Sequence, residues 1–405
     1  MARRKARHRA GLLPDGKVLA AVLAVSVVAG IAFAALSSRA VAPAAAPGSA
    51  AACDGDEPLR VTADPAVAPT LSALAGGFAT MVAEADRPCV GIEVRVMASR
   101  DVVAALRAGW DTEIGGQPPD VWVPDSSVWI DVLRNEGGDE GILPGEAAPL
   151  ARSPLVFAMP GPMADALPDL TIKWRDLLSL PDLEDGWAAY DQPAWGTPRL
   201  AVADPLRSTS GLLTLLSLGV AQDQIWAGGS ADEAIGIDSD IGVLRFRRAV
   251  DTVAPDAGAQ LRAYFEADDP LLELSGIPLL EREMWLFNRG QMALPPASSG
   301  DGATSPPAPM GGQPAVMLKA IYPTEGAYGA DYPFVVLDGD WMDDTSVQAA
   351  ERFGDYLRSD AGQQRFETAG FRGADNSSNP VHRTEDGLWR QLGGYVLAPP
   401  DHPRS

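Results

Sequence analysis

The sequence predicts an α/β protein with two lobes, preceded by one N-terminal transmembrane helix. At 405 residues the chain is too long for one ordinary hydrophobic core and suits two lobes or domains. From Leu59 onward, strand-like and helix-like segments alternate. Strands separated by helices imply a parallel sheet with helices on both faces. The third observation is a single charge-free apolar run near the amino end.

Composition and charge indicate a globular protein that does not bind polyanions. Hydrophobic residues make up 46% of the sequence and charged residues 21%, and the formal net charge is −22. Residues 1–40 hold seven of the 32 Lys and Arg residues and one of the 54 acidic residues, so the rest of the chain is more acidic still. Such a body repels phosphate backbones and anionic lipid headgroups, so we expect no nucleic-acid partner.

The amino end has the features of a membrane anchor. A basic stub over residues 1–17 precedes residues 18–36, a run of 19 residues without a charge, and a small, Pro-containing tether over 37–56 follows. About 20 apolar residues can span a bilayer as a helix, whereas a cleavable signal peptide usually has an apolar stretch of about 7–15. The basic flank favours a single-pass protein of the cell membrane with residues 40–405 extracellular. Cleavage within the small residues 40–46 stays open.

The two cysteines, Cys53 and Cys89, both lie beyond the predicted membrane segment. An exported compartment permits a disulfide, and an even count of cysteines fits one. Acylation of Cys53 is the alternative, but the apolar run ends well before this residue, which is not the usual layout of a lipoprotein. We therefore expect a Cys53–Cys89 disulfide.

The elements follow from the spacing of apolar residues. Short apolar or alternating runs predict strands, and longer segments with apolar residues three and four apart predict helices. The second kind is clearest at Leu71, Leu74 and Phe78, and again at Phe353 and Leu357. The expected strands are residues 59–63, 91–98, 120–123, 153–160, 199–203, 316–323 and 332–337. The expected helices are residues 66–85, 101–109, 126–137, 174–179, 211–219, 242–254, 258–267, 279–289 and 346–366. Residues 297–314 have no apolar periodicity and are expected to form a flexible insertion.

Enzyme motifs are missing from the sequence. The three histidines are His8, in the basic stub, and His382 and His402 near the carboxyl end, and no Cys/His cluster has the spacing of metal ligands. The sequence has no GxSxG, no P-loop and no GxGxxG. We therefore expect no enzyme, no cofactor and no metal, although catalysis by carboxylates alone stays open.

Four polar loops each follow a predicted strand. They span residues 97–101, with Ser99; 124–127, with Asp125, Ser126 and Ser127; 204–211, with Arg207, Ser208, Thr209 and Ser210; and 322–326, with Tyr322. In a parallel sheet such loops lie at the carboxyl edge, where ligands bind. Hydroxyl groups at a helix start can cap the helix, or can present oxygens and backbone N–H groups to a ligand.

These segments resemble a known family. LRV at 59–61, PPDVWVPDSSVWI at 118–130, SPLVFAM, ADPLRSTSG, AIYPTEG, DYPFVVL and GFR at 370–372 are similar to bacterial extracellular solute-binding proteins. The nearest resemblance is to actinobacterial substrate-binding proteins that are often fused to a von Willebrand factor A domain. A more distant one is to the molybdate-binding type 2 periplasmic receptors. The resemblance covers residues 58–375 in order.

The resemblance implies a type 2 periplasmic-binding fold with a hinge and an interlobe cleft. Lobe one would comprise residues 57–153 and 336–395, lobe two residues 154–335, and residues 396–405 a tail. By position, Ser99, Ser126, Ser127, Ser208, Thr209, Ser210 and Tyr332 would line the cleft. The chain departs from the family by adding Asp125, Arg207 and Asp331, which leaves oxyanion specificity open. The Pro-rich carboxyl end also leaves no room for a von Willebrand factor A domain.

The function implied is binding of a small polar solute by lobe closure, for uptake through an ABC permease or for sensing. The first alternative is an envelope scaffold or regulatory protein that kept the fold and binds a protein partner. A carboxylate-dependent hydrolase is a distant second alternative.

Overall fold

The computed structural model describes residues 57–84, 90–135, 137, 141–143, 147–167, 172–226, 247–294, 307–375, 379 and 388. The predicted anchor over 18–36, both cysteines and residues 297–306 of the predicted insertion lie outside these residues. Within the described part of the chain, no helix has the length and hydropathy needed to cross a membrane.

A first five-stranded sheet has the strand order β2-β1-β3-β13-β4. Its strands are β1 (Leu59–Ala63), β2 (Ile92–Val96), β3 (Val121–Val123), β4 (Ala148–Pro149) and β13 (Pro333–Val336). The strands β1, β2 and β3 are parallel, as the alternation of strands and helices predicts. Strand β13 is antiparallel to β3, so a segment more than 200 residues later in the chain completes this sheet.

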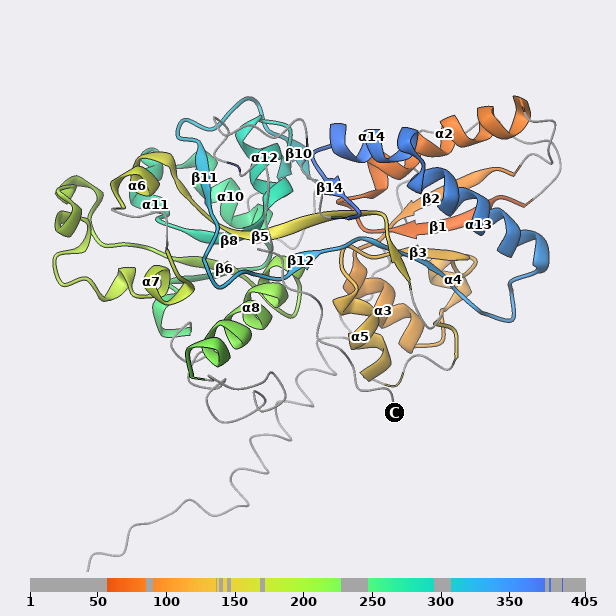
Figure 1. The fold of residues 1–405 in the computed structure, drawn as a ribbon, viewed down its shortest axis with the longest axis horizontal. Coiled ribbons are helices and arrows are strands. Elements are labelled where there is room, and N and C mark those ends of the chain that lie inside the picture. The colour runs from red at the N-terminus through yellow and green to blue at the C-terminus, as the bar shows by residue number, and fades with distance from the viewer. Residues whose placement is uncertain are drawn as a thin grey trace, which may run out of the picture. The chain divides into compact units, whose positions relative to one another are not determined.

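Helices cover both faces of the first sheet (Figure 1). They are α2 (Ala68–Glu84), α3 (Ser99–Arg107), α4 (Thr112–Gly115), α5 (Val128–Asn135), α13 (Asp344–Arg358) and α14 (Asp360–Thr368). Alternate residues of β3 point to opposite faces, and each is fully buried. Val121 and Val123 join the core that contains α2 and α13, whereas Trp122 packs with α3 and α5.

A second sheet is built around the long strand β5 (Ala151–Pro160). All four of its partners run antiparallel to β5. They are β8 (Ile277–Leu280), β11 (Leu318–Ile321), β12 (Gly329–Ala330) and β14 (Arg372–Gly373). A separate parallel pair, β6 (Ala201–Ala203) and β7 (Thr252–Ala254), lies beside β8, and β9 (Ala293–Leu294) pairs with β10 (Ala308–Pro309).

The remaining helices belong to the part of the chain around the second sheet. They are α6 (Gly161–Ala166), α7 (Trp174–Leu178), α8 (Thr209–Trp226), α10 (Ala257–Glu266), α11 (Pro270–Glu273) and α12 (Glu281–Asn288). Three short 3₁₀ turns span Leu180–Asp182, Gly186–Tyr190 and Pro193–Trp195. Helices α8 and α12 both contact β5 and β8 of the second sheet.

The chain passes between the two sheets with almost no intervening loop. Strand β4 of the first sheet leads into β5 of the second after one residue, and β12 leads into β13 after two. A third passage runs from α14 to β14, which pairs with the beginning of β5. Figure 1 shows β5 running from one sheet into the other with β12 beside it.

Three predicted helices are wrong in part. Residues 252–254 form strand β7, because Thr252 and Val253 pair beside β6 instead of continuing a helix. The single helix predicted over 346–366 is two helices, since Ser359 leaves helical geometry with ψ 162°. The Ser359 hydroxyl accepts the N–H of Gly362 and starts α14. The predicted order of elements therefore lacks strand β7, and it also lacks β8, whose residues 279–280 were predicted to begin a helix.

Candidate functional site

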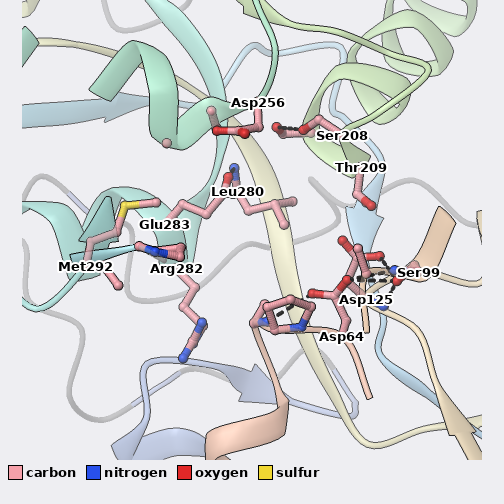
Figure 2. A pocket seen from close by; sticks show the side chains of 18 of the residues that line it. Asp64, Ser99, Asp125, Ser208, Thr209, Asp256, Leu280, Arg282, Glu283 and Met292 are labelled. Carbon is pink, nitrogen blue, oxygen red and sulfur yellow. Dashed lines mark hydrogen bonds between the residues drawn. The ribbon is translucent and has the colours of Figure 1, made fainter. Parts of the chain in front are cut away.

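A pocket of about 650 Å³ lies where helix starts from both sets of elements face one another (Figure 2). One wall comes from segments that follow β1, β2 and β3, with Asp64, Ala98, Ser99, Arg100, Asp125 and Trp129. The other wall comes from the starts of α8, α10 and α12, with Arg207, Ser208, Thr209, Ser210, Asp256, Arg282 and Glu283. Apolar side chains, among them Leu280, Leu286 and Met292, line the rest of this wall.

The structure brings six of the predicted site residues together in this pocket. They are Ser99, Asp125, Arg207, Ser208, Thr209 and Ser210, which come from three of the four predicted loops. The hydroxyl groups of Ser208 and Ser210 are 2.9 Å apart and hydrogen-bonded to each other. Arg207 is exposed at the edge of the pocket.

Two carboxyl groups meet at the hydroxyl of Ser99. Asp64 Oδ2 lies 2.9 Å from Ser99 Oγ and also accepts the Ser99 N–H, while Asp125 Oδ1 lies 2.7 Å from the same Oγ. The N–H of Asp125 donates to this Oγ as well. Because a hydroxyl carries one hydrogen, it donates to only one of the two carboxyl groups. All contacts are satisfied when Asp125 is protonated, donates to Ser99 Oγ, and Ser99 donates to Asp64.

The electrostatics of the pair agree with this arrangement. Burial raises the pKa of Asp125 well above its usual range, and the neighbouring Asp64 carboxylate raises it further. Burial also raises the pKa of Asp64, although hydrogen bonds from Ala66 and Ser99 oppose that change. The pair therefore keeps a proton more tightly than an exposed aspartate does.

Thr209 connects the two walls. The indole Nε1 of Trp129 donates to Thr209 Oγ1 over 2.7 Å, and both side chains are buried. The Thr209 hydroxyl also bonds to the Asp125 carboxyl group and lowers its pKa. A chain of hydrogen bonds thus runs from Trp129 through Thr209, Asp125 and Ser99 to Asp64.

Ser126, Ser127 and Asp331 lie next to the pocket and are not among the residues that line it. Ser126 is buried and its Oγ accepts the N–H of Val128 at 3.4 Å, which caps the start of α5. The Ser127 N–H donates to Asp331 Oδ1 over 2.7 Å. Burial raises the pKa of Asp331, and its bond to Ser127 opposes this. This bond ties α5 to the passage between β12 and β13.

The two predicted tyrosines lie in buried contacts and also do not line the pocket. The Tyr322 hydroxyl donates to Glu281 Oε2 at 2.5 Å, and Glu281 forms a buried ion pair with Arg372 at 2.7 Å. Tyr332 packs edge-on against Phe371 and has a left-handed backbone, with φ 41°. Its N–H donates to the carbonyl oxygen of Asp125. Both tyrosines therefore hold neighbouring segments in place.

The wall formed by α12 carries two charged residues that were not predicted from the sequence. Arg282 donates from Nε to the Ala369 carbonyl over 2.9 Å, and its guanidinium carbon lies 4.1 Å from the centre of the Phe371 ring. Glu283 accepts the N–H of Leu280 at 2.9 Å, and burial raises its pKa to about 7.

Sequence signals existed for some of the missed residues. Asp64 directly follows the first strand, at the same edge as the predicted loops, and Glu283 stands at the third position of a helix, a common place for a capping carboxylate. No sequence signal distinguishes Arg282. Among the described residues, no group of His, Cys, Asp and Glu side chains is arranged to hold a metal ion.

Two solved structures of substrate-binding proteins are similar to this chain. The sulfate-binding protein SubI from Mycobacterium tuberculosis H37Rv is similar over 79% of this chain and 88% of its own, with 15% identity and a TM-score of 0.50. The substrate binding domain of a putative molybdenum ABC transporter from Clostridium difficile matches 78% of this chain and 98% of its own, with 13% identity and a TM-score of 0.43. The likeness to SubI shows an α/β fold of the periplasmic-binding-protein kind.

Curated relatives extend over nearly the whole chain. Two uncharacterized proteins of Mycobacterium tuberculosis, from strains CDC 1551 / Oshkosh and ATCC 25618 / H37Rv, are 27% identical over 368 residues. The match covers 90% of this chain and 50% of each relative, so the chain spans about half the length of the curated relatives it matches.

The family match covers four of the five strands of the first sheet, one wall of the pocket and part of the other wall. Residues 59–260 match the family described as bacterial extracellular solute-binding protein, and this range includes Asp64, Ser99, Asp125, Thr209 and Asp256. Its members bind solutes and are not enzymes, which removes the carboxylate-dependent hydrolase considered from the sequence. Through residues 59–260, this chain belongs to the bacterial extracellular solute-binding proteins.

Proposed function

We propose that this chain is a membrane-tethered extracellular receptor that binds one small polar solute in the 650 Å³ pocket by lobe closure, for uptake or sensing. The observation that carries the proposal is that both walls of the pocket contain helix starts, from α3 and α5 on one side and from α8, α10 and α12 on the other. A ligand that contacts both walls favours the closed form, because it gains contacts that the open form lacks.

The lobes of this receptor would be residues 57–153 with 336–395, and residues 154–335. The two sheets support this division, although β13, at the end of the second range, pairs with β3 in the first sheet. The hinge would be the adjacent passages from β4 to β5 and from β12 to β13. Both are one or two residues long, so a rotation between the sheets needs changes in few backbone angles.

The tether would be the apolar run over residues 18–36, with residues 40–405 outside the membrane. Its length and its basic flank support this placement. Amino-terminal sequencing of the protein from the membrane fraction tests it. A mature end between residues 40 and 53 would show that the segment is a cleaved signal.

Native mass spectrometry of the protein purified from its own host tests solute binding directly. We expect a retained small molecule in the wild type and its loss from Ser208→Trp, because an indole at this pocket position obstructs closure. Thr345→Trp is the matched control, since Thr345 is exposed at the start of α13.

An ABC permease would be the partner for uptake. If wild type and both variants carry no ligand, and no solute in a broad thermal-shift screen stabilises the wild type, the scaffold function is favoured.

A further inference from the structure

The pocket places its own carboxylates where a bound oxyanion would need free donors. Oxyanions are held by backbone N–H groups and hydroxyl groups at helix starts. Ser99 is the first residue of α3, and Asp64 Oδ2 already accepts both its N–H, at 3.1 Å, and its O–H, at 2.9 Å. An anion at this end of the pocket would have to displace a buried carboxylate and would be repelled by it.

At the starts of α10 and α12, carboxylates of the protein also accept backbone N–H groups that an anion would need. Asp256 accepts the N–H of Ala259 over 2.8 Å, and Glu283 accepts the N–H of Leu280 over 2.9 Å. The partial positive charge at a helix amino end favours a negative group within the first turn. Here the protein supplies that group at each of these pocket helices, so less of this attraction is left for an anionic solute.

Among the described residues, the carboxyl groups of the pocket form no close ion pair, although Arg282 lies near enough to favour ionisation of Asp64 and Glu283. Across the part of the chain that the structure describes, no ion pair within 4.0 Å involves Asp64, Asp125, Asp256 or Glu283. The three arginines that line the pocket do not pair with these carboxyl groups. Arg100 pairs with Asp101 at 3.3 Å, and Arg207 is exposed. Arg282 donates to the carbonyl of Ala369 and lies over the ring of Phe371.

The hydrogen bonds at Ser99 are a second, independent sign that the two carboxyl groups need a positive partner. One hydroxyl hydrogen serves two carboxyl groups, so Asp64 and Asp125 need one further proton to satisfy their contacts. The charged or titratable groups that act on this pair are Arg282 and Glu283 of α12 and Tyr332 after β12. Arg282 favours the ionised pair and Glu283 opposes ionisation. A cationic group of a ligand could replace the proton.

We propose that this pocket selects a solute that carries an ammonium or guanidinium group, and that Asp64 is the residue that excludes oxyanions. This inference rests on the proposed solute-binding function. The cationic group lies against Asp64 and Asp125, and its binding releases the proton that they share. The apolar lining, with Trp129, Leu286 and Met292, contacts the carbon skeleton of the solute.

The first test compares probes on the full-length protein by thermal shift and by isothermal titration calorimetry. Arginine, putrescine and choline are the cationic probes, sulfate, phosphate and molybdate the anionic ones, and glucose the neutral one. We expect binding of at least one cationic probe and of no oxyanion. The binding enthalpy of the cation should change with the ionisation enthalpy of the buffer, because a proton leaves the pocket.

Substitutions at Asp64 make the test sharper. Asp64→Asn keeps the side-chain shape and removes the charge, and Asp64→Ser also frees the N–H of Ser99. We expect both to weaken binding of the cation roughly tenfold or more, since a charge-assisted bond is lost. Asp64→Ser should in addition gain binding of sulfate. Asp355→Asn, an exposed charge change on α13, is the matched control and should bind as wild type does. Thermal unfolding without ligand shows whether each variant is folded.

The outcomes separate the two proposals. If sulfate, molybdate or glucose binds the wild type and Ser208→Trp abolishes that binding, solute binding stands and the cationic class is wrong. Unchanged cation affinity in a folded Asp64→Asn variant would also overturn the role of Asp64. If no probe binds and native mass spectrometry finds no retained ligand, the proposed function itself fails.

Discussion

The indole Nε1 of Trp129 donates a hydrogen bond to Oγ1 of Thr209 over 2.7 Å, and this buried bond joins helix α5 to the start of α8. Helix α5 packs with the first sheet, whereas α8 packs with the second. The two walls of the pocket are therefore held together by a specific polar contact as well as by the passages of the backbone. Thr209 was expected from the sequence to contact a ligand, and here it also contacts the opposite wall.

Removing the Thr209 hydroxyl should destabilise the protein. Thr209→Val keeps the shape of the side chain but leaves the Trp129 N–H without its acceptor in a buried place, which costs about 1–3 kcal/mol. Urea unfolding of wild type and variant measures the change. Thr345→Val, the same exchange at an exposed position, should change the free energy of unfolding by less than about 0.5 kcal/mol. Equal effects of the two exchanges would contradict the importance of the bond.

The buried ion pair of Glu281 and Arg372 should be sensitive to the loss of one partner. Arg372→Met removes the cation from a carboxylate that is only 1% exposed, and such changes cost about 3–5 kcal/mol. The double variant Glu281→Met/Arg372→Met should recover much of this loss, because no charge is then left buried. Chemical denaturation of wild type, Arg372→Met and the double variant measures the order of their stabilities. A double variant less stable than Arg372→Met alone would show that the pair is a net stabilising contact.

Stability should depend on pH through Glu283. Burial raises the pKa of this carboxyl group from 4.5 to about 7, so between these values the folded state binds more protons than the unfolded state. The free energy of unfolding therefore falls as the pH rises through this range, by roughly 1.4 kcal/mol for each unit of pKa difference at most. Asp64 and Asp125 act in the same direction, so Glu283→Gln should reduce the slope and not abolish it.

Asp343 supplies a control of opposite sign for that experiment. Its carboxylate accepts the N–H of Ser346 at the start of α13, which lowers its pKa. This contribution to stability is present above the pKa of an unfolded aspartate and is lost as the pH falls through the lower folded value. Asp343→Asn should therefore lower stability at neutral pH, and its difference from wild type should shrink as the pH falls into the acid range. Unfolding curves from pH 3 to pH 8 distinguish the two residues; a Glu283→Gln slope equal to that of wild type would contradict the assignment.

The Cys53–Cys89 disulfide stays a prediction, since both residues lie outside the described part of the chain. The bridge would close a loop of 37 residues, which corresponds to roughly 3–4 kcal/mol in the chain-entropy description. Thiol labelling of the denatured, unreduced protein should find no reactive thiol. Labelling of both cysteines would exclude the bridge, and a lipid mass on Cys53 would favour acylation.

The sequence predicted the parallel part of the fold well, because its strands and helices have clear apolar periods. The sequence predicted secondary structure less well where a helical apolar pattern competes with strand pairing or with helix capping. Residues 252–254 follow a helix-like run, but pairing with β6 decides their structure. Ser359 interrupts a continuous apolar face, since capping of α14 outweighs helix continuation there. Short strands such as β4, β12 and β14 have two residues each, too few for any period.

The site was predictable only in part, for a related reason. Loops at the carboxyl edge gave Ser99, Asp125 and Thr209, because strand order fixes where such loops meet. The opposite wall depends on where α12 lies relative to β5, which no local signal encodes. The places of Arg282 and Glu283 in the pocket wall therefore had to come from the structure, and so did the contact of Asp64 with Ser99.

Strand β5 has a consequence for how the protein folds. Its first residues pair with β14, and Arg152 and Arg372 stand opposite each other although 220 residues separate them. Contacts this distant in sequence are slow to form, because the entropy of closing a long loop is lost before the strand pairing stabilises the structure. Strands β1, β2 and β3 are close in sequence and can associate early, whereas residues 151–152 of β5 pair only when β14 is in place. A protease pulse during refolding should therefore cut near β5 until residues 372–373 are in place.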